Sequence, residues 1–305
     1  MTCTVLGGLL NADSQLDRSR NLNISMKHVF PTLFVFPSLV AMASGATVTW
    51  DSSGVDGNWS LAAGWDTGNV PVLNGTDDAV IDNGAKVTYV PGGDFAIGAG
   101  SSLSISGGST WEQTVSNWTR VNGGEISLDG GTLSRTVGGN LVLGFEDGTG
   151  GTVTLSNSAS LSVGGELWFG RNDNSFTNQV ANVQLSGGSS ISAGGDVGIW
   201  FWDTDASGNS MNLDFISGTE VMTVSGRVGR RNSGGANNSV AWETLWNEGV
   251  LTIDGGNAGS FADHFVTSGT VGTTSYQLQS IPIPEPSTGV IALLGGGLLL
   301  RRRRR

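Results

Sequence analysis

A repeat in the middle of the chain limits the possible folds more than any other feature of this sequence. Each copy begins with alternating apolar and polar residues, continues through a Gly/Ser/Asn turn, and returns after 26 to 31 residues. Clear copies occupy residues 125–144, 152–170, 182–200 and 212–230, and weaker fragments occur at 103–109 and 250–256. Self-similarity at such a period is typical of a solenoid, in which each copy is one turn of the chain.

Each copy contains three short segments with the period-2 alternation of a half-buried strand. Gly-Gly pairs separate these segments, and glycine permits the positive φ of tight corners. The pattern predicts an all-β fold, a parallel β-solenoid (β-helix) of about five to six coils, with no convincing amphipathic helix in residues 47–280. A β-sandwich or jelly roll is the alternative, because antiparallel sheets also show this alternation.

Stacked coils bring equivalent residues of successive copies together in interior rows. The sequence predicts two such rows. The first contains Leu155, Leu185 and Phe215, and the second contains Leu161, Ile191 and Val221.

Residues 47–100 are expected to form an N-terminal capping region, and residues 101–280 the repeats. Three tryptophans near the start are suited to closing the open end of the core. They are Trp50, Trp59 and Trp65. This Trp-rich opening and the segment Asp77–Ile81 resemble the start of repeat-rich exported proteins with autotransporter-like β-strands, a resemblance that bears on the fold alone.

Residues 26–46 have the features of a secretory signal peptide: a short positive start, an apolar run and small residues before the cleavage point. Cleavage is expected after Ala46, because the strand-like sequence TVTW follows at once. Residues 1–25 resemble neither a packed domain nor a targeting segment. They are therefore interpreted as an upstream extension before the true start at Met26, and a real extension before an internal signal anchor is the alternative.

The C-terminal segment, residues 281–305, combines three features of a sorting signal. The motif Pro284-Glu285-Pro286 precedes an apolar run from Thr288 to Leu300, which ends at the membrane-stop residues Arg301, Arg302, Arg303, Arg304 and Arg305. As a short hydrophobic helix the run would extend about 20 Å. It would enter a hydrocarbon core of roughly 30 Å only if the arginines snorkel and the bilayer thins. The arginines would hold their end on the cytoplasmic side.

This tail closely resembles the PEP-CTERM sorting domain of exported bacterial proteins over residues 284–305. The resemblance implies recognition and processing by a membrane enzyme of the exosortase type, after export through the Sec route. It also implies a transient anchor in the inner membrane, followed by a place in the cell envelope or outside the cell. An ordinary C-terminal anchor with a chance Pro-Glu-Pro is the alternative.

Cysteine content and charge exclude several kinds of function. The single cysteine, Cys3, precedes the predicted signal peptide, so the mature chain would have no disulfide, cysteine nucleophile or cysteine-based zinc site. Between Thr47 and Pro286 there are seven Lys/Arg against 24 Asp/Glu, a net charge of −17. Such a surface repels nucleic acid and anionic membranes, and it suits divalent cations or neutral glycans. An acidic surface also keeps an exported protein soluble, and this alone is a sufficient alternative explanation of the negative charge.

The segment from Asp203 to Asp214 is the best candidate for a metal site. Its oxygen-bearing side chains alternate around Gly208, as in an EF-hand-type calcium loop. The predicted Ca²⁺ ligands are Asp203, Asp205, Ser207, Asn209 and Asp214. No helices are expected beside this segment, its last ligand is Asp in place of Glu, and Asp214 points outward from an expected strand. A plain polar turn is the alternative, and no other cofactor is expected.

Outward-facing tryptophans are the candidates for glycan stacking. Trp200 and Trp202 adjoin the predicted calcium segment, and Trp168 lies one coil earlier, at the position matched with Gly198. Planar apolar rings are suited to stacking on sugar rings. The alternative is that these rings pack inside the solenoid or beneath its loops.

Signatures of catalysis are sparse. His264 is the one histidine after the signal peptide, and spacing alone assembles no Ser-His-Asp triad. Basic partners for the carboxylates are also few. They are Arg171, Arg227, Arg230 and Arg231. Of these, Arg171 and Arg230-Arg231 fall at comparable corners and form either a small positive strip or separately solvated side chains.

Two functions are consistent with these features. The favoured prediction is an exported, envelope-sorted, non-enzymatic β-solenoid protein, a structural or adhesive component of the extracellular polysaccharide or biofilm matrix. The matrix role is what the PEP-CTERM resemblance implies. The alternative is a carbohydrate-active enzyme, such as a polysaccharide lyase or hydrolase, or a glycan-binding module on the same scaffold. The expected partners are an exosortase-type enzyme, extracellular polysaccharide and, through the tail, the membrane.

Overall fold

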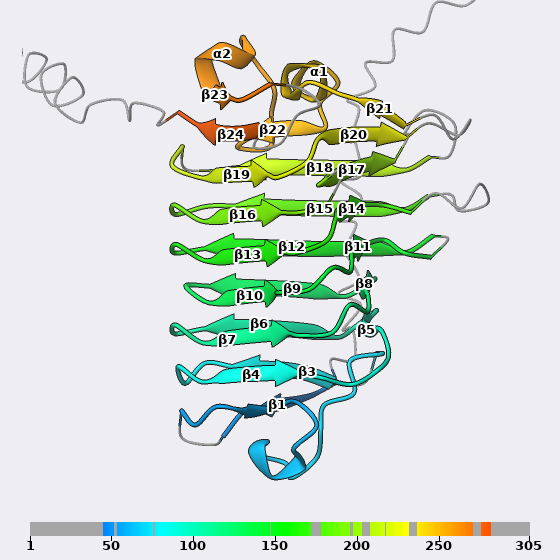
Figure 1. Ribbon diagram of the computed structural model, residues 1–305, viewed down its shortest axis with the longest axis vertical. Coiled ribbons are helices and arrows are strands. Elements are labelled where there is room, and N and C mark those ends of the chain that lie inside the picture. The colour runs from blue at the N-terminus through cyan, green and yellow to red at the C-terminus, as the bar shows by residue number, and fades with distance from the viewer. Residues whose placement is uncertain are drawn as a thin grey trace, which may run out of the picture. The chain divides into compact units, whose positions relative to one another are not determined.

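The structure, a computed structural model, describes residues 45–51, 54–75, 77–146, 148–171, 178–195, 198–202, 208–216, 218–231, 237–270 and 276–281. All of them belong to the second of two compact units, Met42–Arg305. In this unit the chain forms a stack of turns, each with strands in three sheets (Figure 1). Most of the predicted signal peptide, the calcium ligands at 203–207 and the sorting motif with its apolar run lie outside the described residues.

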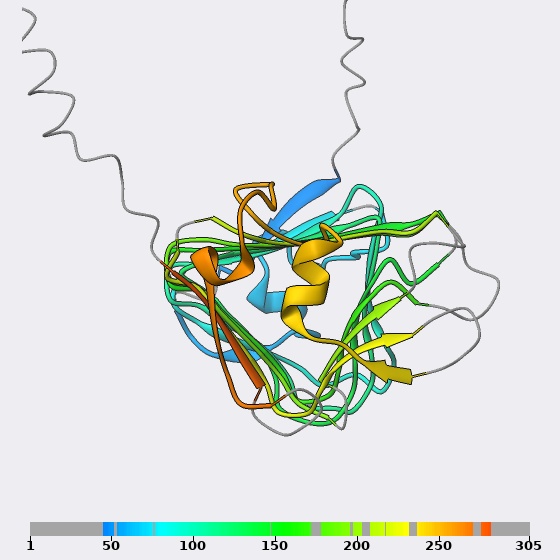
Figure 2. The same cartoon turned by 90° about the horizontal axis from the view of Figure 1, so that it is seen from above.

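Three sheets form the sides of the solenoid, as the view along its axis shows (Figure 2). The first sheet has the order β1 (Ala46–Thr49), β3 (Asp77–Ile81), β6 (Ser102–Ser106), β9 (Glu125–Asp129), β12 (Gly150–Ser156), β15 (Val180–Leu185), β18 (Ser210–Phe215) and β22 (Leu251–Ile253). The second has the order β2 (Gly57–Asn58), β4 (Lys86–Tyr89), β7 (Thr110–Gln113), β10 (Thr132–Arg135), β13 (Ser160–Val163), β16 (Ser190–Ala193), β19 (Val221–Val224), β24 (Tyr276–Ser280) and β23 (Phe265–Ser268). The third has the order β21 (Asn237–Ser239), β20 (Val228–Arg231), β17 (Ile199–Trp202), β14 (Leu167–Phe169), β11 (Leu141–Leu143), β8 (Thr119–Asn122) and β5 (Phe95–Gly98).

Six complete turns, from β3–β4–β5 to β18–β19–β20, confirm the predicted all-β, parallel β-solenoid. The first complete turn covers Asp77–Gly98 and therefore falls within residues 47–100, which were expected to form the cap. Ile81 pairs with Ile105, 24 residues later, whereas Leu155 pairs with Leu185, 30 residues later. The unequal turn lengths explain why the repeat is clearest in the second half of the solenoid.

The register of the sheets confirms one predicted interior row and corrects the other. Leu155, Leu185 and Phe215 pair in sequence along the first sheet. In the second sheet, however, Ile191 pairs with Met222, and Val221 pairs with Ser190 on the outward side. The turn between β18 and β19 contains one residue more than the turn between β15 and β16, so the strand is displaced by one position, which exchanges its two faces.

The register expected from the sequence is also wrong at one place in the third sheet. Trp168 pairs with Trp200, so the predicted match of Trp168 with Gly198 was wrong. The corner between β16 and β17 is two residues longer than the corner between β13 and β14. The three residues of β14 therefore lie beside Ile199, Trp200 and Phe201.

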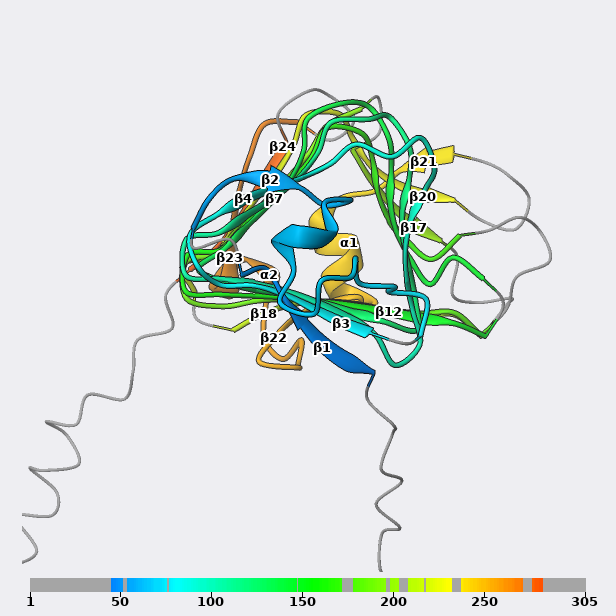
Figure 3. The same cartoon turned by 90° about the horizontal axis from the view of Figure 1, so that it is seen from below.

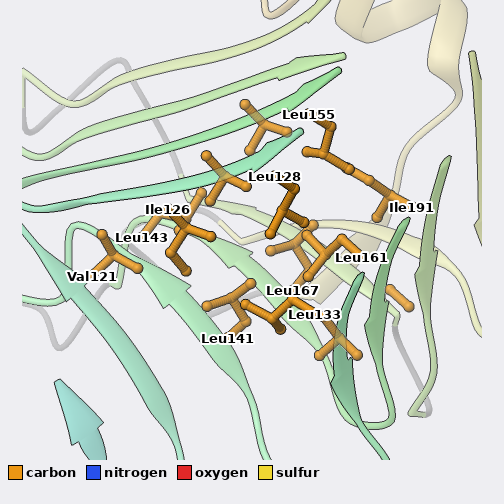
Figure 4. Close-up of a cluster of buried hydrophobic side chains, with 14 of the residues drawn as sticks. Val121, Ile126, Leu128, Leu133, Leu141, Leu143, Leu155, Leu161, Leu167 and Ile191 are labelled. Carbon is orange, nitrogen blue, oxygen red and sulfur yellow. The ribbon is translucent and has the colours of Figure 1, made fainter. Parts of the chain in front are cut away.

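Inward-facing aliphatic side chains from all three sheets fill the interior of the solenoid (Figure 4). Leu133 in β10 and Leu161 in β13 are paired in register, and both are fully buried. Their contacts repeat from turn to turn, so the core is continuous along the stack.

The glycine pairs serve two different purposes. Gly187 and Gly188 have φ values of +61° and +74°, as expected for a tight corner. At Gly165 the reason is close stacking, because a Cβ atom there would lie 2.3 Å from the carbonyl oxygen of Gly139 in the preceding turn.

Aromatic residues lie at both ends of the stack. At the N-terminal end, the segment containing η1 (Ala62–Gly64) crosses the opening of the coil (Figure 3). Trp65 makes edge-to-face contacts with Trp50 and Trp59, at ring-centroid distances of 5.1 and 4.8 Å. All three indoles are buried.

At the other end, α1 (Trp242–Asn247) lies across the opening (Figure 2), and α2 (Phe261–His264) follows β22. Both helices fall in 47–280, where none was expected. Trp242, Leu245 and Trp246 are buried and have the i, i+3, i+4 spacing of one apolar helix face. Six residues are too few for that periodicity to be distinctive in the sequence. In the described part of the chain, no helix is long and apolar enough to cross a membrane.

The corrected register leads to a stability prediction. Met222→Ala is expected to lower the free energy of unfolding by about 2–5 kcal/mol, because Met222 is fully buried. Val221→Ala should cost about 1 kcal/mol or less, since that side chain is partly exposed. Urea unfolding of the two variants measures the difference, and a larger loss for Val221→Ala would restore the register expected from the sequence.

A candidate binding groove on the third sheet

The outer face of the third sheet contains a groove of about 300 Å³, near the lower limit of typical small-ligand sites. We call it the third-sheet groove. Its lining comes from the corners before β5 and β8, from β8 itself, and from the ends of β11 and β14. The lining residues are Asp94, Ser116, Asn117, Trp118, Arg120, Phe145 and Arg171.

Strand alternation places Arg120 on this face. Thr119 and Val121 of β8 are fully buried, so the side chain between them points outward. Val142 of β11 pairs with Arg120, and Trp168 of β14 pairs in turn with Val142. The groove therefore lies beside an outward row that contains Arg120 and Trp168.

A continuous band of aromatic rings crosses this face. Trp118 is 5.8 Å from Phe145 and 5.4 Å from Trp168, measured between ring centroids. Trp168 is 5.5 Å from Trp202, which stacks on Trp200 at 6.3 Å. Such ring pairs add about 0.5–1.5 kcal/mol each beyond the area that they bury, so the band gives the groove a rigid wall.

Two guanidinium groups lie against the aromatic rings of the groove. The Cζ atoms of Arg120 and Arg171 are 4.0 and 4.1 Å from the centroid of Phe145. They are also 5.9 and 5.6 Å from the centroid of Trp118. These are cation–π distances, and the contacts hold both charged groups in fixed positions.

Asp94 is the carboxylate among the lining residues. It forms an ion pair with Arg120 and also accepts a hydrogen bond of 2.9 Å from the backbone N–H of Trp118. Asp94 therefore joins the corner before β5 to the corner before β8. This arrangement orients the Arg120 guanidinium toward the groove.

A third arginine lies directly behind the groove. Arg135 is 1% exposed, and its Nε donates to Oε1 of Gln113 at 2.9 Å. Its Nη2 donates to the backbone carbonyl of Asn117, a lining residue. Its Nη1 is buried and has no hydrogen-bond acceptor among the described residues. Burial lowers the pKa of Arg135 to about 10, while nearby Asp94 opposes the shift, so the group remains charged at neutral pH.

The predicted glycan-stacking tryptophans lie together in the aromatic band, but two of them are not available to a ligand. Trp200 is 5% exposed and Trp202 is 2% exposed, which corrects the expectation that both face outward freely. Trp168 is partly exposed. The indole N–H groups of Trp168 and Trp200 donate to Oε2 of Glu166 at 2.7 and 3.1 Å, so this carboxylate fixes the two rings.

The predicted arginine strip is divided among different places. Arg171 lines the groove, and Arg227 lies 5.9 Å from the ring of Trp200. Arg230 forms an ion pair of 2.5 Å with Glu248. Arg231 belongs to β20, and its side chain is outside the described part of the structure.

Two of the predicted calcium ligands are described, and both make structural hydrogen bonds. Oδ1 of Asn209 accepts from the backbone N–H of Gln179 at 2.9 Å. Oδ1 of Asp214 accepts from Thr252 Oγ1 at 2.7 Å and from the backbone N–H of Gly255 at 2.9 Å. Asp214 is 6% exposed, so the outward position expected for it is covered. The described residues contain no group of three or more metal-binding side chains, and the calcium site stays a prediction.

Sequence reasoning missed three residues that line this groove, Trp118, Arg120 and Phe145, and Arg135 behind it. The available signals were weak. Three of the seven basic residues between Thr47 and Pro286 are Arg120, Arg135 and Arg171, but they belong to three different turns. Comparisons of the chain with known protein families, with characterised proteins and with solved structures gave no match.

Proposed function

We propose that this chain is an exported, non-enzymatic β-solenoid protein of the cell envelope, which holds extracellular polysaccharide through the third-sheet groove. The observation that carries the proposal is the groove itself, where the partly exposed ring of Trp118 stands beside Asp94, Asn117 and two arginines. Ligand sites commonly combine apolar ring surface with a few placed polar groups. A rigid wall of this kind retains a sugar chain without needing a catalytic group.

The proposed route to the envelope leaves the complete turns of the solenoid in the mature protein. The signal peptide, residues 26–46, would be removed after Ala46, a cut that takes the first residue of β1 and leaves Thr47–Thr49 to pair with β3. The last strand, β24, ends at Ser280, before the Pro284-Glu285-Pro286 motif of the sorting tail. Both cuts would leave the six turns intact. An exosortase-type enzyme would process the tail after its apolar run and Arg301–Arg305 had held the protein transiently in the inner membrane.

The scaffold role is supported by how the chain would be stabilised outside the cell. The mature part contains no cysteine, so its stability must come from the core and the parallel ladders. We assign the buried Trp50–Trp59–Trp65 cluster the role of an N-terminal cap, since Trp59 and Trp65 flank η1, the segment that crosses the opening of the coil (Figure 3). A capped, acidic solenoid of this kind resists end-to-end aggregation and suits a spacer or adhesive protein.

Export and sorting are tested by measuring the intact mass of the protein recovered from the envelope and the medium of its native host. The expected species begins at Thr47 and ends at 284–286. A Pro286→Ala variant should accumulate with Arg301–Arg305 still attached. Recovery of that uncut form from the unaltered protein would remove the sorting proposal.

The non-enzymatic role is tested by incubating the purified protein with the host's extracellular polysaccharide. Co-sedimentation with the polymer and no release of new reducing or unsaturated ends is the expected result. Product release above that of the heat-denatured protein would instead support the carbohydrate-active enzyme.

A further inference from the structure

We propose that the third-sheet groove recognises an acidic sugar unit, one that carries a carboxylate, in preference to a neutral sugar. The inference rests on the proposed function and names the substrate class of the same groove. It follows from three features of the site: its charge, its excess of hydrogen-bond donors and its rigidity.

The groove carries the opposite charge from the rest of the protein. The segment Thr47–Pro286 has a net charge of −17, yet three of its seven basic residues meet at this one place. Two of them, Arg120 and Arg171, line the groove, and Asp94 pairs with Arg120. Arg135 adds a third positive charge directly behind the wall, where low local polarity strengthens its effect. A neutral ligand would gain little from this concentration of charge.

Two of the guanidinium groups, those of Arg120 and Arg135, also have donors that no described residue accepts. Nε of Arg120 and Nη1 of Arg135 are both buried and have no acceptor in the described part of the chain. Asp94 accepts from Nη2 of Arg120 and from the backbone of Trp118. A buried donor without a partner is costly, and an anion in the groove would lower that cost by electrostatic attraction.

The two lining arginines are held in place before any ligand binds. Phe145 contacts both guanidiniums at about 4 Å, so their side-chain entropy is already reduced. Arginine matches a carboxylate with two parallel hydrogen bonds, which a hydroxyl group does not reproduce. The ring of Trp118 then contacts the apolar face of the same sugar. Together these groups select a ring that bears a carboxylate.

The experiment is isothermal titration of the purified full-length chain with a matched set of probes in the presence of a metal chelator. The probes are tetragalacturonic acid, its fully methyl-esterified form and neutral cellotetraose. The acid is expected to bind about 10- to 100-fold more tightly than its ester, the effect of one charged hydrogen-bonded pair. Its affinity should fall as salt is raised from low to high concentration, because salt screens the charges.

Variants connect the preference to the groove. Arg171→Gln and Arg120→Gln should each reduce the ratio of acid affinity to ester affinity about tenfold or more, and Arg171→Lys should retain part of the preference. Arg230→Gln is the matched control, because Arg230 lies on the same sheet but pairs with Glu248. It should bind the acid like the unaltered protein. Thermal unfolding of each variant shows whether the fold is retained.

Other results overturn the proposal in distinguishable ways. Equal affinity of the unaltered protein for the acid and the ester removes the acidic preference and leaves the proposed polysaccharide function standing. Acid binding that Arg230→Gln weakens as much as Arg171→Gln removes the assignment to this groove. Absence of binding to all three probes, combined with no co-sedimentation of the host's own polysaccharide, removes both proposals.

Discussion

Replacing Trp111 by alanine is expected to lower the free energy of unfolding by about 3–5 kcal/mol, the cost typical of removing a large buried aromatic side chain. Trp111 is fully buried inside the second turn. Its ring contacts those of Tyr89 and Phe95, at centroid distances of 5.9 and 4.8 Å. The same interior row holds Val87 and Leu133 in the adjacent turns. These smaller side chains cannot fill the cavity, because the backbone ladders on both sides fix their positions.

Urea unfolding of three variants separates the loss of core packing at Trp111 from the general effect of removing a tryptophan side chain. Trp118→Ala is the matched control, since the same side chain is removed from the outer face, and it should cost about 1–2 kcal/mol. Trp111→Phe should be milder than Trp111→Ala, because it keeps most of the ring volume and removes an indole N–H that has no acceptor among the described residues. Equal losses for Trp111→Ala and Trp118→Ala would contradict the inward position of Trp111.

The fold followed from the sequence wherever the repeat kept its length. Leu155, Leu185 and Phe215 are separated by equal intervals, so the interior row that they form was predicted correctly. Val221 was misplaced because a single residue added in a turn exchanges the two faces of the next strand. The sequence does not show whether the extra residue lies before or after the strand, whereas the hydrogen bonding in the sheet pairs Ile191 with Met222 and so places it before the strand.

The third-sheet groove was missed for a different reason: its lining residues come from separate turns. Alternation in β8 indicates that Arg120 points outward, but it does not show which residues lie beside it. Phe145 and Arg171 come from later turns, and Asp94 comes from an earlier one. Their meeting depends on the length of every corner between residues 94 and 171, and those lengths vary from turn to turn.

The tryptophans of β17 show that an outward position in a strand does not predict exposure to solvent. Trp200 and Trp202 occupy outward positions of β17, yet all four residues of this strand are buried. Trp202 packs on Trp168 and Trp200, so the outer face of the third sheet forms a small second core. In a strand rich in aromatic residues, outward therefore does not mean exposed.

Asp214→Ala is expected to be the most destabilising change on an outward position, lowering the free energy of unfolding by about 3 kcal/mol. The carboxylate accepts hydrogen bonds from Thr252 Oγ1 and from the backbone of Gly255, both beyond the last complete turn. Hydrogen bonds to a charged group contribute about 1.5–3 kcal/mol each, and the buried hydroxyl of Thr252 would lose its acceptor. Thr154→Ala is the matched control, because Thr154 lies in the same outward column, two turns earlier. It should change stability by about 0.5 kcal/mol or less.

The same variant decides between the structural role of Asp214 and its predicted role as a calcium ligand. If the hydrogen bonds to β22 and the following turn are its main purpose, the loss in Asp214→Ala is the same in excess chelator and in millimolar Ca²⁺. A calcium ligand behaves differently, because an ion that binds the folded state alone raises the melting temperature by mass action. The unaltered protein would then be stabilised by Ca²⁺, and Asp214→Ala would lose that increment. We expect the first result, since Oδ1 of Asp214 already accepts two hydrogen bonds, one from Thr252 in β22 and one from the backbone of Gly255 after it.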